Sequence, residues 1–220
     1  MSAAPTTPIW FLLARDRRLA YLQMPKAGCT SMRAALCLLS RPDIPREQLL
    51  ARGAFAGHRE WSDAVGPGDP ILPHFFRFTF VRHPYERFAS FFRSKIEDRP
   101  AERIKPRFQR LGLRAGMSPE EVFTAVEAAP RETLDPHVAP QSYFVYDGEQ
   151  PRVEFIGQLE ELAAGLEEIA VRTGTRVEVP RLNVTEHNPA AAPREPLSAA
   201  LKARLAAFYA EDFTRFGYAP

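Results

Sequence analysis

The sequence predicts one α/β domain with a central, mostly parallel β-sheet flanked by helices. Strand-like and helix-like patterns alternate along the chain, which is typical of this fold class. Residues 75–81, FFRFTFV, are apolar or aromatic almost throughout, as in a strand that is buried on both faces. The 220 residues, 45% of them hydrophobic and 25% charged, are enough for a single sizeable core.

Three further stretches have strand-like patterns. Residues 9–14 and 19–24 are short apolar runs separated by an arginine-rich turn, which is typical of two joined strands. Residues 153–157 form another short run directly before a helical pattern. Residues 1–8 are polar and rich in proline and threonine, so we expect a flexible tail there. The domain is therefore expected to span residues 9–220.

Helical periodicity marks the segments between the later strands. The first helix is expected to begin at a cap formed by Thr30 or Ser31 and to run to about Ser40. A second helix is expected to begin at Pro84 and to bury an aromatic stripe. Later helices are expected after a capping box at residues 118–121, over residues 159–172 and over residues 197–209.

Charge and cysteine content argue against several classes of function. The net charge of +2 does not favour a nucleic-acid partner, so any anion must be recognised locally. Cys29 and Cys37, if both lie on the first helix, are about 12 Å apart, which is too far for a disulfide. Two cysteines also provide no zinc-site spacing. No apolar run is long enough for a membrane span, so we expect a cytoplasmic protein without stable membrane insertion.

The stretch YLQMPKAGCTS, residues 21–31, has the composition of a phosphate-binding turn. A strand that leads into a helix directs backbone N–H groups and the positive end of the helix dipole at the turn. Gly28 allows close approach of an anion, and Lys26 supplies a positive charge. Thr30 and Ser31 offer hydroxyl groups. The lysine precedes the glycine, so the order differs from that of a Walker loop. An ordinary strand–turn–helix connection explains the same residues without any ligand.

A second stretch, FTFVRHPYERFASFF at residues 78–92, places Arg82 directly after the buried strand. In open α/β sheets, ligands bind at the carboxyl ends of the strands. Ser90 lies on the following helix, and Arg82 and Ser90 can hold one phosphate together. In the alternative interpretation, Arg82 and Arg87 are ordinary surface charges.

Together the two stretches resemble the sulfotransferases that use 3′-phosphoadenosine 5′-phosphosulfate (PAPS). The resemblance is to the carbohydrate, heparan and chondroitin type and its bacterial relatives. The loop that binds the 5′-phosphosulfate in that family corresponds here to Pro25, Lys26, Ala27, Gly28, Cys29, Thr30 and Ser31. The element that binds the 3′-phosphate corresponds to residues 82–90. Segments DPHVAPQSYFV (135–145), VEFIGQLEELAAGLEEI (153–169) and FYAEDFTRFGY (208–218) also resemble family segments, so the resemblance covers nearly the whole chain.

The resemblance implies a P-loop-NTPase-like fold and transfer of the sulfuryl group from PAPS to an acceptor. The product would be 3′-phosphoadenosine 5′-phosphate (PAP), and the scheme requires no metal. Lys26 then lies at the leaving phosphate, with the two loop hydroxyls on the remaining 5′ oxygens and Arg33 as a further candidate contact. Arg82 and Ser90 hold the 3′-phosphate.

A histidine is the natural general base for the proton of the acceptor. His58, in FAGHREW, lies at a chain position similar to that of the catalytic histidine of heparan 6-O-type relatives. His137 belongs to the chondroitin-like segment and is the second candidate. His83 lies inside the 3′-phosphate element and is set aside. On the sequence, His58 is the preferred base.

The acceptor is expected to be a carbohydrate or another small hydroxylated molecule. Trp61 is a candidate wall of the acceptor site, or a surface on which a sugar stacks. Arg103 and Arg107 lie in the basic segment, residues 97–118, which is expected to be an insertion or lid that receives an anionic carbohydrate. A solvated helical face explains the same charges.

Two other functions are compatible with parts of the sequence. A nucleotide-dependent kinase with an atypical phosphate loop would need Mg²⁺ ligands, yet the strand at residues 75–81 does not end in an aspartate. A non-catalytic module that binds a phosphonucleotide or a glycan is the second alternative, and Lys26 argues against it.

Overall fold

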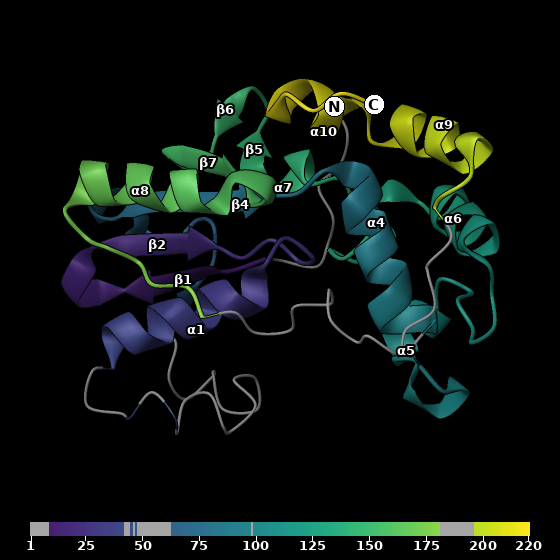
Figure 1. The fold of residues 1–220 in the computed structure, drawn as a ribbon, viewed down its shortest axis with the longest axis horizontal. Helices are drawn as coiled ribbons and strands as arrows, with labels where there is room; N and C mark the ends of the chain where they lie inside the picture. Colours follow the sequence, from purple (N-terminus) through teal and green to yellow (C-terminus); the bar gives the residue numbers. More distant parts are fainter. Residues whose placement is uncertain (1–8, 42–44, 46, 48–62, 98, 181–195) are drawn as a thin grey trace. The chain divides into compact units, whose positions relative to one another are not determined.

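The structure, a computed structural model, describes residues 9–41, 45, 47, 63–97, 99–180 and 196–220 (Figure 1). These residues form two compact units. The sheet unit comprises Ile9–Val81 and Asp147–Arg194, and the helical unit comprises Arg82–Tyr146 and Glu195–Pro220, each as far as it is described. Buried apolar side chains form a core in each unit.

The sheet unit is built on five strands in the order β3-β1-β2-β4-β7. Their bounds are Asp63–Val65 for β3, Phe11–Ala14 for β1, Leu19–Leu22 for β2, Phe76–Val81 for β4 and Phe155–Gln158 for β7. Strands β2, β4 and β7 are parallel neighbours, whereas β1 runs antiparallel to both β2 and β3. A separate hairpin joins β5 (Tyr146–Asp147) to β6 (Gln150–Pro151). The predicted α/β architecture with a parallel centre is therefore confirmed.

Strand β4 has a neighbour on each side, which explains why its sequence is apolar almost throughout. The register sets Phe78 opposite Tyr21 of β2 and Phe80 opposite Gly157 of β7. Thr79 is a buried polar residue of this strand, and its hydroxyl donates to the Leu22 carbonyl at 2.8 Å. Burial of that hydroxyl therefore leaves no unsatisfied group.

Some strands are not predicted by the sequence pattern, or are predicted with different bounds. Strand β3 has three residues, and β5 and β6 have two each. These strands are mostly exposed, so their sequences show no alternation of apolar and polar residues. Backbone pairing alone defines them. Strand β7 covers Phe155–Gln158 instead of residues 153–157.

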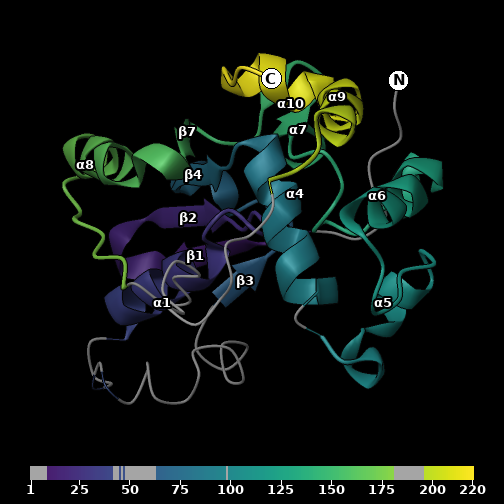
Figure 2. The same ribbon diagram turned by 45° about the vertical axis from the view of Figure 1, so that its right-hand side comes forward.

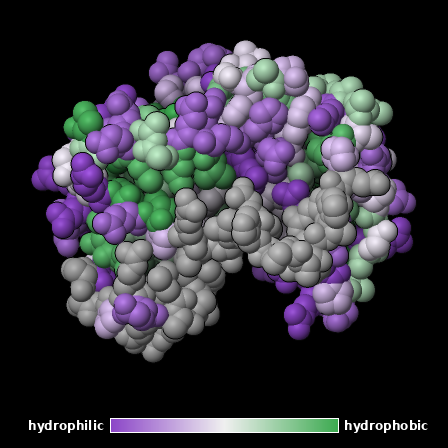
Figure 3. All heavy atoms as spheres, viewed as in Figure 1, coloured by the Kyte–Doolittle hydropathy of each residue, from purple (hydrophilic) through white to green (hydrophobic). Residues whose placement is uncertain are grey.

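Helices α1 (Cys29–Ser40) and α8 (Leu162–Thr173) pack on the same face of the sheet (Figures 1 and 2). Met32 and Leu36 of α1 and Ile169 of α8 share one apolar cluster with side chains of β1, β2 and β4. Figure 3 shows further apolar side chains at the surface between these two helices. The short 3₁₀ turns of this unit are η1 (Arg15–Arg17), η2 (Leu72–His74) and η6 (Leu159–Glu161).

Two glycines allow α8 and β7 to approach Phe80 closely. A Cβ added at Gly157 would lie 2.5 Å from a ring carbon of Phe80, and one at Gly165 would lie 2.6 Å from the same carbon. Phe80 also meets Phe155 edge-on, with ring centroids 6.2 Å apart. The ring of Phe80 therefore fills the space that these two side chains would need.

In the residues that the structure describes, the helical unit consists of α4 and a set of short helices and turns. Their bounds are Pro84–Phe92 (α4), Ala101–Arg103 (η4), Pro106–Gln109 (α5), Pro119–Ala128 (α6), Arg131–Thr133 (η5), Ser142–Val145 (α7), Ala199–Phe208 (α9) and Ala210–Phe216 (α10). A π-helical turn, η3 (Arg93–Glu97), follows α4 directly. The capping box at Ser118 and Glu121 opens α6 as predicted. The last predicted helix, over residues 197–209, corresponds to α9, and α10 follows as a further helix that the sequence analysis does not predict.

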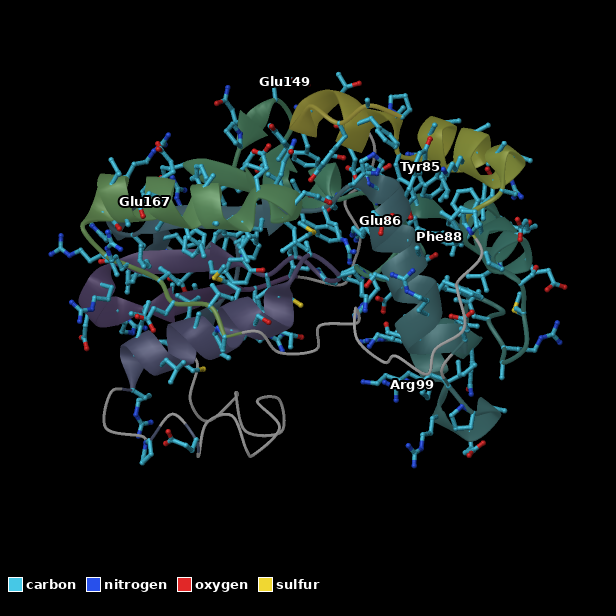
Figure 4. All side chains as sticks on the ribbon, viewed as in Figure 1. Tyr85, Glu86, Phe88, Arg99, Glu149 and Glu167 are labelled. Carbon is cyan, nitrogen blue, oxygen red and sulfur yellow. The ribbon has the colours of Figure 1, made fainter. Side chains whose placement is uncertain are left out.

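Helix α4 begins at Pro84, as predicted, and its aromatic residues form the centre of this unit. Phe88 meets Phe123 of α6 edge-on, with ring centroids 5.5 Å apart. Tyr85, which projects from the same helix (Figure 4), meets Phe213 of α10 at 5.2 Å. These contacts fix α4 against α6 and α10.

The basic segment, residues 97–118, is anchored to the helical unit by three buried apolar side chains, those of Ile104, Phe108 and Leu113. Phe108 meets Phe91 of α4 edge-on, with ring centroids 5.4 Å apart. The basic side chains between these anchors are mostly exposed. The segment is therefore amphipathic and packed on one side.

Substitution of Gly157 by alanine should destabilise the fold, because its Cβ would overlap the Phe80 ring. Overpacking of this kind costs about 1–3 kcal/mol of the free energy of unfolding. Gly68→Ala is the matched control, since nothing lies within 4 Å of its added Cβ. Urea unfolding of both variants tests this, and equal midpoints for Gly157→Ala and Gly68→Ala would contradict it.

Candidate functional site

The loop between β2 and α1 has two residues in the left-handed region of backbone conformation. Lys26 has a φ of 69° and Gly28 a φ of 72°. For a lysine this conformation carries strain, and such strain is concentrated at functional sites. The turn is closed by a hydrogen bond from the Ala27 N–H to the Met24 carbonyl at 3.3 Å. The loop therefore has a defined and unusual backbone shape.

Gly28 is the residue that caps α1. It lies in the cap position, and a Cβ there would come within 2.8 Å of the Leu159 side chain. The expected cap by Thr30 or Ser31 is wrong, because both residues lie within the first turn and α1 has no side-chain cap. Met32 donates the first helical hydrogen bond, to the Gly28 carbonyl at 3.1 Å. The N–H groups of the turn before Met32 therefore face the start of the helix, where anions bind.

Arg33, one turn into α1, is held by a neighbour in the same loop. Its guanidinium donates from Nε to the Gln23 side-chain oxygen at 2.6 Å, and Nη2 bonds to the same oxygen. Gln23 is buried, and its N–H donates to the Trp10 carbonyl at 3.0 Å. Gln23 and Arg33 therefore join the two ends of the loop, a contact that the sequence pattern does not reveal.

Arg82 follows the last residue of β4, as the sequence predicts. Its side chain is 23% exposed and forms an ion pair with Glu86, one helical turn later, at 3.5 Å. The backbone of Arg82 bonds to the side chain of Gln141 through both its N–H and its carbonyl. Ser90 lies on α4 and is half-buried, and its hydroxyl has no partner among the described residues.

Arg87 is buried, so the alternative interpretation of this residue as an ordinary surface charge is wrong. Its side chain is 2% exposed, because it turns inward from α4. The guanidinium donates to the Ala139 carbonyl at 2.8 Å and to the Pro136 carbonyl at 2.7 Å. The Tyr209 hydroxyl donates to the Val138 carbonyl at 2.6 Å. The segment of residues 135–142 is therefore held by buried side chains from α4 and from the turn between α9 and α10.

His137 forms a dyad with Asp135 on this segment. The ring nitrogen Nδ1 lies 2.7 Å from one carboxylate oxygen of Asp135, and the His137 N–H donates to the same oxygen at 2.9 Å. Arg107 forms an ion pair with the other oxygen at 3.1 Å. Asp135 is 6% exposed and His137 is 19% exposed. The carboxylate therefore holds Nδ1–H, and Nε2 is left as a proton acceptor.

The environment of the dyad keeps His137 neutral. Burial lowers the pKa of His137 to about 4, even though Asp135 acts in the opposite direction. Arg107 and Lys95 lower it further by repulsion. Burial alone would raise the pKa of Asp135, but the hydrogen bonds and charge of His137 and the charge of Arg107 outweigh that effect and lower it. At neutral pH the pair is a carboxylate and a neutral imidazole.

Several predicted site residues lie elsewhere or outside the described residues. His58 and Trp61 lie outside the described residues. His83 caps α4, since its Nδ1 accepts from the Tyr85 N–H at 3.3 Å and its Nε2 lies 3.0 Å from the Ala219 carbonyl. Arg103 is exposed on η4.

The described residues contain no group of three or more His, Cys, Asp or Glu side chains that could hold a metal ion. Cys29 and Cys37 are both free and lie on α1, as the sequence suggests. In the described part of the chain, every helix is too short or too polar to cross a membrane.

Asp135, Gln141 and Asp212 carry contacts that the sequence analysis does not assign. All three lie in stretches that resemble family segments, at DPHVAPQ and FYAEDF. The spacing Asp-Pro-His is a local signal, because an aspartate side chain commonly bonds the N–H two residues later. Gln141 and Asp212 have no such local signal, since their partners lie far away in the sequence.

A family model described as the sulfotransferase family matches residues 10–219. The match includes the loop before α1, the Arg82 element and the segment of residues 135–142. No curated protein and no solved structure matches the chain.

His137 should make the free energy of unfolding depend on pH. Its pKa is near 6.5 in an unfolded chain and about 4 in the folded protein, so the unfolded state binds more protons between these values. Stability therefore decreases as the pH is lowered through this window, by about 2 kcal/mol from pH 7 to pH 5 for this residue. His137→Gln should remove that part of the decline, as measured by urea unfolding at both pH values. His74→Gln changes an exposed histidine and is the control; the same decline in wild type and in His137→Gln would refute the prediction.

Proposed function

Because the chain belongs to the sulfotransferase family, we propose that it transfers the sulfuryl group of PAPS to a hydroxyl of a carbohydrate or another small acceptor. The observation that carries the proposal is the loop before α1. It combines a lysine and a glycine in the left-handed region with the start of a helix, which together form a phosphate-binding shape. The fold is the P-loop-like α/β fold of this family.

The topology supports one donor for both phosphate elements. Strands β2 and β4 are parallel neighbours, so both end at the same edge of the sheet. The lysine loop follows β2 in the chain, and Arg82 follows β4. Ligands of open α/β sheets bind at this edge. In the proposal Lys26 and the loop residues 25–31 hold the 5′-phosphosulfate, and Arg82 and Ser90 hold the 3′-phosphate.

The transfer itself needs a base and a stabilised leaving group. The acceptor oxygen attacks sulfur, and the new S–O bond forms as the bond from sulfur to the 5′-phosphate oxygen breaks. The acceptor proton passes to the base, and the electron pair of the broken bond stays on the phosphate of PAP. Lys26 is proposed to balance the charge that develops on that oxygen. Arg33 is proposed as a support of the loop through Gln23.

We assign the base to His137. Its dyad with Asp135 supports this choice, because a carboxylate on Nδ1 leaves the lone pair of Nε2 in place to accept a proton. The lowered pKa keeps this nitrogen deprotonated throughout the neutral range. His58 remains the alternative base. Asp135 is then a positioning residue that fixes the tautomer and the ring orientation of His137.

The surroundings of His137 suit an acceptor that carries negative charge beside its hydroxyl. Arg107 lies on the dyad and over the Phe108 ring at 4.9 Å, and Lys95 contributes positive potential at His137. Arg103 adds an exposed positive charge on the same basic segment. An acidic carbohydrate offers both features, a hydroxyl and a carboxylate or sulfate.

Removal of either phosphate contact should weaken nucleotide binding. Lys26→Ala and Arg82→Ala should each raise the Kd of PAP by about ten- to hundredfold, because each removes charge-assisted hydrogen bonds. Isothermal titration calorimetry measures this directly. Arg176→Ala, which changes an exposed arginine of the sheet unit, is the control. Unchanged affinity in both loop and strand-end variants would refute the PAPS proposal.

Loss of the base should stop turnover and leave binding intact. His137→Ala should lower kcat by about 10²–10⁴-fold while the Kd of PAP stays within about twofold. Asp135→Asn should lower kcat less, since the imidazole remains. Transfer from labelled PAPS to a panel of acidic and neutral glycans, lipids and phenols gives the rates. Full turnover in His137→Ala together with its loss in His58→Ala would assign the base to His58.

A further inference from the structure

The carboxamide of Gln141 binds the backbone of Arg82 at both polar groups. Its Oε1 accepts from the Arg82 N–H at 3.0 Å, and its Nε2 donates to the Arg82 carbonyl at 2.9 Å. Gln141 is fully buried. Two hydrogen bonds of this kind fix the plane of the carboxamide against one residue of the backbone.

These bonds take over where the sheet ladder ends. The last pair of β4 with β7 joins Val81 to Gln158, and Arg82 is the next residue of the chain. The Gln141 side chain therefore supplies a partner for both backbone polar groups of Arg82, as a paired strand does for residues within a sheet. The backbone of Arg82 is thereby kept in one orientation, and that orientation sets the direction in which its side chain leaves the chain.

Gln141 is itself held by a buried carboxylate. Asp212, on α10, is 0% exposed and accepts from the Gln141 N–H and from the Ser142 N–H, each at 2.8 Å. Its Oδ2 also lies 3.4 Å from Nε2 of Gln141. Because a carboxylate accepts hydrogen bonds, the NH₂ group of the carboxamide faces Asp212, and Oε1 is therefore directed to the Arg82 N–H. Asp212 therefore fixes both the position and the flip of the Gln141 side chain.

We propose that Gln141, held by Asp212, is a positioning residue for the 3′-phosphate of the donor, which it serves by fixing the backbone from which Arg82 projects. This inference rests on the proposed function, because it uses the assignment of Arg82 to the 3′-phosphate. Gln141 touches no nucleotide in this scheme. It also lies four residues after His137, on the segment that Arg87 holds, so the same segment supports the base and the grip on the donor.

The test compares two nucleotides that differ only in the 3′-phosphate. PAP and adenosine 5′-monophosphate are titrated into wild type, Gln141→Ala, Gln141→Glu and the control Gln150→Ala, an exposed glutamine of β6. Gln141→Ala should raise the Kd of PAP about five- to thirtyfold, the effect of two lost hydrogen bonds, and leave that of adenosine 5′-monophosphate within about twofold. Gln141→Glu should also weaken PAP, because it loses the donor to the Arg82 carbonyl.

A double-mutant cycle makes the assignment specific. In the Arg82→Ala background, Gln141→Ala should cause no further loss of PAP affinity, since the group that it positions is absent. The KM of PAPS should rise in Gln141→Ala while kcat stays within about threefold of wild type. A residue that only stabilised the helical unit would reduce the affinity for both nucleotides and would add to Arg82→Ala.

Each outcome has one meaning. Equal losses for PAP and adenosine 5′-monophosphate, or additive losses with Arg82→Ala, would overturn the positioning assignment and leave the proposed function standing. A wild type that binds both nucleotides equally would overturn the proposed function, and this inference with it. If Gln141→Ala does not fold, Gln141→Asn, which is one methylene too short to reach both groups of Arg82, gives the same comparison.

Discussion

The buried guanidinium of Arg87 is the interaction on which the candidate site depends. A charge that is 2% exposed requires fixed partners, because an unpaired buried charge costs several kcal/mol. The carbonyls of Pro136 and Ala139 supply those partners, on either side of His137. The segment of residues 135–142 has no regular secondary structure before α7, and the hydrogen bonds of Arg87, together with those of Tyr209 and Asp212, hold it in one conformation. The dyad of Asp135 and His137 lies on this segment.

A second constraint acts through Asp212 and reaches the end of β4. Asp212 holds the backbone of Gln141, and Gln141 holds the backbone of Arg82. Burial raises the pKa of Asp212, while Arg87 and the two N–H donors act in the opposite direction. Arg87 and Asp212 are thus a cation and a carboxyl group that stabilise the same segment from two sides. Polar groups of this kind are satisfied only in one arrangement, which favours a single geometry over a looser apolar core.

The loop before α1 contains a strained backbone conformation at Lys26. Lys26 adopts a φ of 69°, which costs of order 1–3 kcal/mol for a residue with a side chain. Contacts around the loop offset this cost, among them the Gln23–Arg33 pair and the packing of Leu159 on Gly28. The lysine, the glycine and the helix start of this loop are therefore preorganised, which lowers the conformational entropy cost of binding an anion.

The sequence by itself determined the strand–helix alternation, the buried strand β4, the start of α4 at Pro84 and the family of the chain. These features depend on local patterns: apolar runs, a proline at a helix start, and short motifs whose residues are neighbours. It also identified His137 as a candidate base, although the sequence by itself favoured His58. The predicted hydroxyl cap of α1 was wrong, because Gly28, in the left-handed region, occupies the cap position. Gly28 packs against Leu159, a residue far away in the sequence.

Only the tertiary structure decided which polar residues act together. Arg87 carries the same local pattern as a surface arginine, yet it is buried because carbonyls about fifty residues later accept its hydrogen bonds. Gln141 and Asp212 are ordinary polar residues in the sequence, and their contacts with Arg82 and with each other join positions 59 and 71 residues apart. Hydrogen bonds between distant residues produce no periodic pattern in the sequence. Their strength depends on the direction of the bond and on burial, and both are set only when the chain has folded.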